Sequence, residues 1–391
     1  MNQATKDFIK SFADEDVINL SLKRSKFYDV DIPLAIRQIE GKQKVRKKIP
    51  TFFVCEDLLY PVKLSLEQSS SEITADYKSK RCDGKVLVDL TGGFGVDSYF
   101  FSFRFEQIIY VERQEELCGL AEHNFKALKR TNIQVVCDSA EKYLTRTKIC
   151  DWIYLDPARR TANGKKTIRL VDSEPDVTNL AGKLLEKSEN VMIKLSPMID
   201  IASILKELPQ TIEIHIIAVE NECKEIIAIM KRSATGNLSI RTINIPNSKP
   251  VEIFDFQIGD EECASTQFAN DLNDYLYEPN AAVMKSGAFK LISEQYAVAK
   301  LHNNSHLYTS NKLIRDFPGR IFRVKKIYDF SKEAIKQLRI NSDSANLAIR
   351  NFPMTVDELR KRLKLLDGGD TYLFATTVQH EKRVLISCFK V

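Results

Sequence analysis

Glycine, histidine, tryptophan and paired cysteines are scarce in this sequence. Its 391 residues include 14 glycines, five histidines and one tryptophan. The eight cysteines stand singly, with no Cys-x-x-Cys spacing and no histidine cluster beside them. This pattern is typical of reduced thiols and argues against a disulfide framework or a zinc site. No metal is therefore expected.

Long apolar runs are also absent. No stretch approaches the roughly 18 apolar residues that a membrane helix needs, so we expect no membrane segment and no membrane partner. The first residues, Met1–Asp7, show no apolar segment behind a basic one, which argues against a secretory signal. We expect a cytoplasmic protein.

Basic residues are concentrated at the two ends of the chain. Residues 281–391 carry 20 Lys and Arg against 10 Asp and Glu, and residues 1–50 carry 11 against 7. The middle of the chain is acidic, since the whole chain has a formal net charge of only +5. Basic ends indicate a polyanionic partner held by the terminal parts, with ordinary solvated surface as the alternative.

The sequence divides into three predicted parts, as its length leads one to expect. Residues 1–80 show helical patterns and predict a helical N-terminal module. Residues 81–262 alternate short apolar runs with amphipathic helices, which is typical of an α/β domain with a mostly parallel sheet. The runs are residues 86–90, 108–111, 133–136, 152–155, 191–195, 212–219, 226–230 and 240–245. The last runs leave little room for helices, so we expect antiparallel strands there.

Residues 275–391 predict a separate α+β domain. A helix over residues 355–366 and strands over 372–377 and 383–389 suggest a small β-α-β-β unit.

Two predicted helix starts match the capping-box spacing, one in the N-terminal module and one in the C-terminal domain. They are Ser65 with Gln68 and Thr355 with Glu358.

Three of the few glycines lie together in V-L-V-D-L-T-G-G-F-G-V-D, residues 86–97. Gly92, Gly93 and Gly95 directly follow the first apolar run of the α/β region. Glycines at this place let the chain turn tightly and bring backbone N–H groups and a helix N terminus to a ligand. We therefore expect a ligand against this loop.

Acidic residues close four successive predicted strands: Asp89, Glu112, Asp138 and Asp156. In open α/β sheets, ligands bind outside the carboxyl ends of the strands. Glu112 could accept both hydroxyls of a ribose and Asp138 an adenine amino group, although Asp138 could equally be a helix N-cap. As a set, with the glycines, these residues predict a nucleoside site.

The glycine spacing favours one nucleoside over another. A dinucleotide fingerprint requires G-x-G-x-x-G, and Ser98 stands where the third glycine belongs, so a nicotinamide enzyme is disfavoured. The segment D-L-T-G-G-F-G, residues 89–95, resembles instead the D-x-G-x-G-x-G motif of class I S-adenosylmethionine-dependent methyltransferases, with Thr91 in place of the first glycine. Together with L-D-P-A-R-R and V-M-I-K-L-S-P-M-I-D, it resembles more specifically a bacterial group of methyltransferases that carry a THUMP-like domain at the C terminus.

This resemblance implies a Rossmann-like seven-stranded sheet with an antiparallel last strand, and a THUMP-like or ferredoxin-like C-terminal domain. It implies S-adenosyl-L-methionine as the cofactor and RNA, either tRNA or rRNA, as the acceptor, because THUMP domains bind RNA. The donor-binding residues that it implies are Asp89, Thr91, Gly92, Gly93, Phe94, Gly95, Glu112, Asp138, Ser139 and Gln68.

The fourth motif of such enzymes holds the acceptor. Aminomethyltransferases have Asn/Asp-Pro-Pro-aromatic there, and the matching positions are Asp156, Pro157, Ala158 and Arg159. We expect Asp156, Pro157 and Arg159 to be catalytic, with Asp156 accepting a hydrogen bond from an amine that becomes cationic in the transition state. The missing aromatic residue disfavours adenine-N6 chemistry on DNA.

Further substrate contacts are expected around this motif. Arg159 and Arg160 could stack on a base or hold a phosphate, with a surface salt bridge as the alternative. Lys194 and Ser196 end the fifth strand on the opposite rim, where Lys194 could contact a phosphate or simply be solvated. More distant RNA contacts are expected at residues 323–326 and 360–364 and in the basic run that ends at Lys48.

Two other functions stay open at this point. The chain could be a methyltransferase that acts on a protein or a small molecule, or an RNA-binding protein that keeps the cofactor fold without turnover. The sequence does not indicate the RNA, the base, the methylated atom or the oligomeric state.

Overall fold

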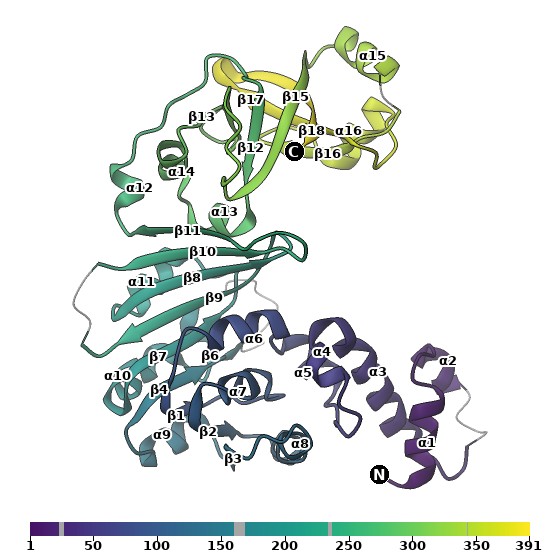
Figure 1. Cartoon of the computed structure of the whole chain (residues 1–391), viewed down its shortest axis with the longest axis vertical. Coiled ribbons are helices and arrows are strands. Elements are labelled where there is room, and N and C mark those ends of the chain that lie inside the picture. Colours follow the sequence, from purple (N-terminus) through teal and green to yellow (C-terminus); the bar gives the residue numbers. More distant parts are fainter. Residues whose placement is uncertain (23–26, 160–168, 234–236, 342) are drawn as a thin grey trace. The chain divides into compact units, whose positions relative to one another are not determined.

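A computed structural model describes residues 1–391 apart from 23–26, 160–168, 234–236 and 342 (Figure 1). It divides into two compact units, Met1–Glu213 with Ile226–Gly236, and Ile214–Glu225 with Asn237–Val391. Within the described residues, no helix is both long and apolar enough to cross a membrane.

The N-terminal region is helical, as predicted. Its helices are α1 (Gln3–Ser11), α2 (Val17–Leu22), α3 (Ile32–Lys48), α4 (Pro50–Phe53), α5 (Lys63–Gln68) and α6 (Glu72–Ser79). The predicted capping box at Ser65 is wrong, because Ser65 lies inside α5, which starts without a side-chain cap. The cap in this region is Ser71, whose hydroxyl accepts a hydrogen bond from Thr74 N at the start of α6.

The first sheet contains all eight predicted strands of the α/β region. Its order is β11-β10-β8-β9-β7-β4-β1-β2-β3, with parallel pairing from β3 through β1 to β7 and antiparallel pairing between β7 and β9. Its strands are β1 (Gly84–Asp89), β2 (Phe105–Glu112), β3 (Ile133–Cys137), β4 (Cys150–Leu155), β7 (Ser188–Leu195), β8 (Thr211–Val219), β9 (Glu222–Lys231), β10 (Ser239–Ile245) and β11 (Glu252–Gln257).

The mostly parallel α/β fold is confirmed, but the sheet has nine strands, whereas the family resemblance implied seven and the apolar runs predicted eight. The strand without a predicted run is β11, which pairs with β10 as an antiparallel hairpin. Strand β11 has no continuous apolar run, because buried and exposed residues alternate along it. The chain order reverses between β1 and β4, and this is the switch point where α/β sheets bind ligands.

Helices cover both faces of this sheet. Figure 1 shows α7 (Val96–Phe101) and α8 (Glu115–Ala127) on one face, with α9 (Ala140–Arg146) and α10 (Val177–Lys187) on the other. One hydrophobic core joins α7, α8 and β2 to helices α3 to α6 of the N-terminal region. The N-terminal helices therefore form part of the wall around the switch point. The remaining elements are α11 (Ile201–Glu207), η2 (Leu170–Asp172) and a two-stranded ribbon of β5 (Ala158–Arg159) and β6 (Ser173–Glu174).

The C-terminal region forms a second sheet in the order β13-β14-β12-β15-β18-β17-β16. Its strands are β12 (Tyr275–Pro279), β13 (Ala299–Lys300), β14 (Tyr308–Ser310), β15 (Gly319–Asp329), β16 (Asn346–Arg350), β17 (Thr371–Val378) and β18 (Lys382–Lys390). Its helices are α12 (Asp260–Cys263), α13 (Ala281–Ser286), α14 (Phe289–Gln295), α15 (Lys332–Asn341), α16 (Val356–Leu363) and η3 (Gln379–Glu381).

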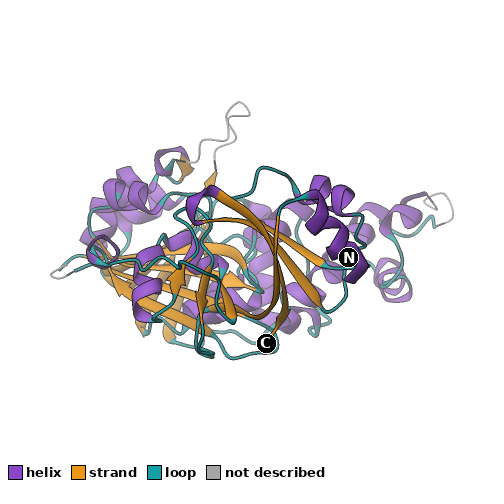
Figure 2. Cartoon of the chain, turned by 90° about the horizontal axis from the view of Figure 1, so that it is seen from above, coloured by secondary structure: helices purple, strands orange, loops and turns teal. Residues whose placement is uncertain are grey.

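The predicted β-α-β-β unit is confirmed as β16, α16, β17 and β18. Strand β16 pairs parallel with β17, and β17 pairs antiparallel with β18. Both hydrogen bonds of the predicted capping box at Thr355 and Glu358 are present. Helices α15 and α16 pack on one face of this sheet through a core that includes Leu338, Leu359 and Leu373. Figure 2 shows the helices of the chain in purple and its strands in orange.

Candidate functional site

Asp89 ends β1 inside the protein, at the switch point of the first sheet. Its Oδ1 accepts a hydrogen bond from Thr91 N at 3.0 Å, and its Oδ2 accepts one from the Ser98 hydroxyl at 2.6 Å. Burial raises the pKa of Asp89 to about 7, even though both hydrogen bonds act to lower it; Asp97 and Asp156 raise it further. The Asp89 carboxyl therefore orients the glycine loop through Thr91 N, and it can change its charge near neutral pH.

The three glycines of the loop are needed for different reasons. A Cβ on Gly92 would lie 2.1 Å from the Tyr110 ring, and one on Gly95 would lie 2.7 Å from the Phe125 ring. These two glycines make room for side chains of the protein itself, and the expectation that a ligand also lies against their backbone stays a prediction. Gly93 has a φ of +56°, which favours glycine, and the nearest atom to its added Cβ is a backbone oxygen 3.8 Å away. Of the three glycines, Gly93 is the one at which an added Cβ would meet no side chain.

Glu112, at the end of β2, fastens this loop to the sheet. Its Oε2 accepts from Gly93 N at 3.0 Å and its Oε1 accepts from Gln114 N at 2.9 Å. A carboxylate has about four acceptor positions, so Glu112 retains capacity for two further donors such as ribose hydroxyls. The Tyr110 hydroxyl donates to Gly93 O at 2.5 Å and braces the loop from the other side.

Asp138 follows β3 and is not a helix cap. The N-cap of α9 is Ser139, whose hydroxyl accepts from Lys142 N at 3.3 Å. Asp138 instead pairs with Arg146 at 2.5 Å and accepts from Ser139 N at 2.9 Å. The structure therefore excludes Asp138 as a helix N-cap, and its contact with an adenine amino group stays a prediction. The sequence did not predict the ion pair with Arg146.

Asp156 lies at the end of β4 and is linked directly to the glycine loop. Its N–H donates to the Thr91 hydroxyl at 2.6 Å, and its Oδ2 accepts from Lys194 Nζ at 2.5 Å. Lys194 comes from β7, so the ion pair joins the ends of adjacent strands. Lys194 lies at the end of β7, as expected, and its ammonium group is bonded to Asp156 instead of being only solvated.

The other predicted residues vary in how closely they approach this centre. Phe94 is buried, and its ring packs against Phe52 and Tyr60, so its side chain belongs to the core. Gln68 is the exposed last residue of α5, and the Ser196 hydroxyl accepts from Met198 N at 3.2 Å.

The acceptor motif continues into the β5–β6 ribbon. Pro157 immediately precedes β5, and Arg159 pairs through its backbone with Ser173 of β6. Arg160 lies outside the described residues.

A buried ion pair beside the site was not predicted. Lys78 of α6 is fully buried, and its Nζ lies 3.1 Å from Asp97 Oδ1 at the start of α7. Asp97 Oδ2 also accepts from the Ser70 hydroxyl at 2.7 Å and from the Tyr154 hydroxyl at 2.9 Å. Burial alone would raise the pKa of Asp97, but the Lys78 ammonium and the other partners outweigh it and lower the pKa.

This network connects three segments that the sequence does not bring together. It ties the N-terminal helices to α7, which follows the glycine loop, and to β4, which ends at Asp156. The only signal in the sequence was an acidic residue, Asp97, two positions after Gly95.

Lys48, the end of a predicted RNA-binding run, points inward. Its Nζ donates to the carbonyl oxygens of Leu66 at 2.6 Å and Glu67 at 2.9 Å, at the end of α5. Burial, followed by the nearby Lys194 ammonium, lowers the pKa of Lys48 to about 8. Since Lys48 is held by α5, the expectation that it contacts RNA phosphates as part of a solvated run is not supported.

We predict a pH dependence of stability that comes from Asp89. The pKa of Asp89 is about 7 in the folded chain against an ordinary value of 3.8, so the unfolded chain loses this proton first as the pH rises. Between about pH 4 and pH 7 this group therefore makes the free energy of unfolding smaller, by an amount on the order of 4 kcal/mol. Asp89→Asn should remove that decrease. Urea unfolding of both proteins at several pH values measures it, and identical pH profiles would contradict the prediction.

Comparisons with known proteins point to one family. Residues 275–318 match a family described as a ferredoxin-like domain, and residues 319–390 match one described as THUMP domain-like. The chain is 35% identical to a predicted methyltransferase from Porphyromonas gingivalis of known crystal structure, over 99% of this chain and 98% of that chain, with a TM-score of 0.90.

A curated relative matches a shorter part of the chain. It is ribosomal RNA small subunit methyltransferase J of Hydrogenovibrio crunogenus, with 28% identity over 129 residues, which is 28% of this chain and 47% of that protein. The chain thus spans about half the length of this relative, 47%. From the whole-length likeness to the Porphyromonas protein, the THUMP-like match and the D-L-T-G-G-F-G loop, the chain belongs to the class I S-adenosylmethionine-dependent methyltransferases that carry a C-terminal THUMP-like domain.

Proposed function

We propose that this protein transfers a methyl group from S-adenosyl-L-methionine to a base amine of a structured RNA, either tRNA or rRNA, in the cytoplasm. The observation that carries the proposal is the bond between the two halves of the site. Asp156, in the acceptor motif, donates its N–H to Thr91 in the donor loop at 2.6 Å. The acceptor carboxylate is thereby held in a fixed position next to the loop that would bind the donor.

The residues at the switch point fit this donor. Gly93 offers open space and a left-handed turn, and Glu112 keeps acceptor capacity for ribose hydroxyls after holding Gly93 N. Asp138 stands at the end of the next strand for the adenine amino group, with its position set by Arg146. When bound, the donor would supply an electrophilic methyl group on a sulfonium.

The chain's own contribution to the reaction is to orient the acceptor. Lys194 takes Oδ2 of Asp156, so that Oδ1, which receives no hydrogen bond from the described residues, can accept from the amine. With the donor bound, Asp156 would hold the amine nitrogen in line with the electrophilic methyl group and would accept the proton that the nitrogen releases. A carboxylate held at this nitrogen favours the cationic transition state, and alignment contributes the rest of the rate.

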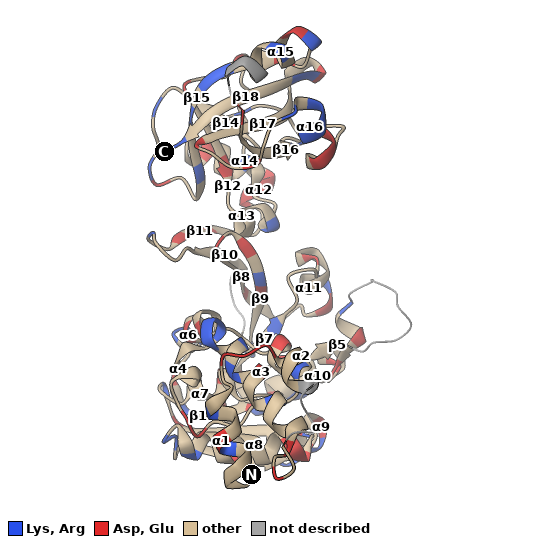
Figure 3. Ribbon diagram, turned by 90° about the vertical axis from the view of Figure 1, so that its right-hand side faces the viewer, with Lys and Arg blue, Asp and Glu red and all other residues tan. Residues whose placement is uncertain are grey.

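An RNA acceptor is supported by the C-terminal domain, which we propose spans residues 275–391. Its last part is THUMP-like, and the curated relative is named as a ribosomal RNA methyltransferase. Lys and Arg residues, whose ribbon is blue in Figure 3, are found on β15 and α16. Such cations bind phosphates without regard to sequence, so they favour RNA in general over one site.

Calorimetric titration with S-adenosylhomocysteine, with NAD in parallel, tests the donor. We expect binding of the thioether alone, and a large loss of affinity in Asp89→Ala, because this change removes both oxygens that accept from Thr91 N and from the Ser98 hydroxyl. Transfer of labelled methyl to fractionated RNA then tests the acceptor. Binding of NAD alone would contradict S-adenosyl-L-methionine as the donor. Labelling of protein or of small molecules, and not of RNA, would assign the acceptor to another class. RNA binding without any methylated product would favour a non-catalytic RNA-binding protein.

A further inference from the structure

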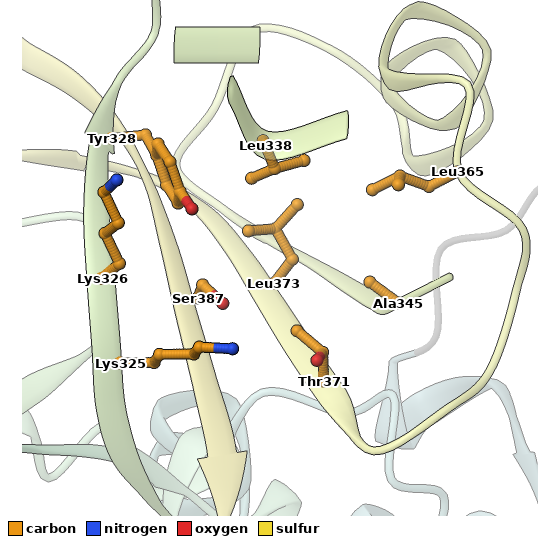
Figure 4. A pocket seen from close by; sticks show the side chains of 9 residues that line it. All are labelled: Lys325, Lys326, Tyr328, Leu338, Ala345, Leu365, Thr371, Leu373 and Ser387. Atoms are coloured by element: carbon orange, nitrogen blue, oxygen red, sulfur yellow. The ribbon is translucent and has the colours of Figure 1, made fainter. Parts of the chain in front are cut away.

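The second sheet contains a pocket that the methyl-transfer site does not use. Its volume is about 240 Å³, and it lies between the sheet and the segments that cover it (Figure 4). Its wall is apolar at Tyr328, Leu338, Leu365 and Leu373. Ligand pockets for drug-sized molecules span roughly 300–1,000 Å³, so this one suits a single flat group and excludes a large cofactor.

Two lysines and two hydroxyls line the same pocket. The hydroxyls are those of Thr371 at the start of β17 and Ser387 in β18, and the lysines are Lys325 and Lys326 of β15. Figure 4 shows the Lys325 side chain extending across the strands toward Thr371. The pocket therefore combines an apolar interior with positive charge on one side.

A β-bulge explains how two consecutive residues can line one pocket. Side chains of neighbouring strand residues normally point to opposite faces. In β15, however, Val324 pairs with Cys388 and Lys326 pairs with the next residue, Ser387, so that Lys325 is the extra residue of a bulge. Bulges redirect side chains and are common beside functional sites.

The lysines are available to an anionic ligand. Lys325 Nζ lies 5.1 Å from the centroid of the Phe389 ring, and Lys326 Nζ lies 5.0 Å from that of Tyr328. Both side chains are exposed, and in the part of the chain that the structure describes neither forms an ion pair with a carboxylate. By contrast, Arg360 and Lys382 of the same region are paired, with Asp367 and Asp329.

We propose that this pocket binds one unpaired nucleotide of an RNA strand, with the base in the apolar interior and its phosphate beside Lys325 and Lys326. The inference rests on RNA being the acceptor and adds a place where the substrate is held, separate from the residues that would transfer the methyl group. The volume and the apolar side chains of the pocket suit a base, the hydroxyls of Thr371 and Ser387 can bond its edge, and the ammonium groups complement one phosphate. A free mononucleotide has the same chemistry, and titration with a nucleoside monophosphate distinguishes it from an RNA strand as the ligand.

The test measures binding of a fluorescein-labelled single-stranded RNA hexanucleotide to the full chain by anisotropy. In Lys325→Ala/Lys326→Ala we expect about tenfold weaker binding and a salt slope smaller by about 0.7, as one lost phosphate contact on a single strand predicts. The matched control is Lys332→Ala/Lys336→Ala, which removes the same charge from exposed positions of α15 outside the pocket lining. It should bind the RNA within about twofold of the wild type.

A second variant separates the pocket from the charge. Thr371→Trp fills the pocket while keeping both lysines, and should also weaken binding by roughly tenfold, the usual value of one stacked base. Crosslinking of a 4-thiouridine hexanucleotide to the unmutated chain, with adducts expected in β15 or β17, keeps the proposal testable if this variant does not fold. Titration with a nucleoside monophosphate shows whether a free nucleotide suffices, and binding as tight as that of the hexanucleotide would overturn the RNA assignment.

The failures of the two proposals are distinguishable. Equal losses in the two lysine pairs, unchanged binding in Thr371→Trp, or crosslinks outside the pocket would overturn the pocket while leaving methyl transfer to RNA intact. Absence of any RNA binding in a chain that still binds S-adenosylhomocysteine would overturn the RNA acceptor, and the pocket proposal with it.

Discussion

Replacing Lys78 by methionine is expected to lower the free energy of unfolding by about 3–5 kcal/mol, the usual cost of leaving one member of a buried ion pair without its partner. Lys78 is fully buried and faces Asp97 at 3.1 Å. Methionine keeps much of the length of the side chain and removes the charge, so the Asp97 carboxylate would remain buried without its cation. With a typical total stability of roughly 5–15 kcal/mol, this loss would be visible as a large shift in urea unfolding.

The chain offers a matched control two residues away. Lys80 pairs with Asp76 at 2.6 Å, but its side chain is 53% exposed. Exposed pairs one helical turn apart contribute only about 0.3–0.5 kcal/mol, so Lys80→Met should leave stability almost unchanged. Equal effects of the two substitutions would show that the buried pair has no special role.

A double variant, Lys78→Met with Asp97→Asn, tests whether the charge itself is the cause. Asparagine has the shape of aspartate and can still accept from the Ser70 and Tyr154 hydroxyls. Because no buried charge remains, the double variant should be more stable than Lys78→Met alone. If it is not, the cost in Lys78→Met comes from packing, and the ion pair is not what holds α6, α7 and β4 together.

Replacing Asp156 by alanine is expected to reduce the rate of methyl transfer by about 10²–10³, a loss typical of removing one preorganised group that stabilises transition-state charge. The affinity for S-adenosylhomocysteine should change little, because the backbone N–H that bonds Thr91 remains after the substitution. Single-turnover transfer to RNA and calorimetry on the same variant measure the two effects separately.

Asp76→Ala serves as its control, since Asp76 is a partly exposed carboxylate on α6 whose salt-bridge partner is Lys80. A wild-type rate in Asp156→Ala would move the acceptor contact elsewhere and remove Asp156 from the reaction. Loss of donor affinity together with rate would instead mean that Lys194, left without its partner carboxylate at 2.5 Å, disturbs the loop.

The strand ends could be predicted from the sequence, and most of their tertiary contacts could not. Asp89, Glu112 and Asp156 follow apolar runs that form parallel strands, and parallel strands in one sheet bring their carboxyl ends to the same edge. Which partner each carboxylate takes is not visible in that pattern. The bond of Glu112 to Gly93 N, and that of Asp138 to Arg146, depend on the angles at which loops leave the strands.

Local helix signals show the same limit. The sequences at Ser65 and Thr355 have identical capping-box spacing, yet only Thr355 starts a helix. Ser65 lies within a helix that begins at Lys63 and buries Leu66 against the core, so packing decided where that helix starts. The bulge at Lys325 likewise has no signature in R-V-K-K, because it arises from the register between β15 and β18.

The amino-acid sequence by itself determined the order of elements, the parallel strands and the glycine loop with its carboxylates, since these follow from apolar periodicity and from the conformations that glycine permits. Only the tertiary structure decided that Gly92 and Gly95 make room for Tyr110 and Phe125, that Lys78 neutralises Asp97, and that Lys194 bonds Asp156. These contacts join residues from different elements, far apart in the chain. Their existence depends on how the helices and strands pack, which the pattern of a single segment does not record.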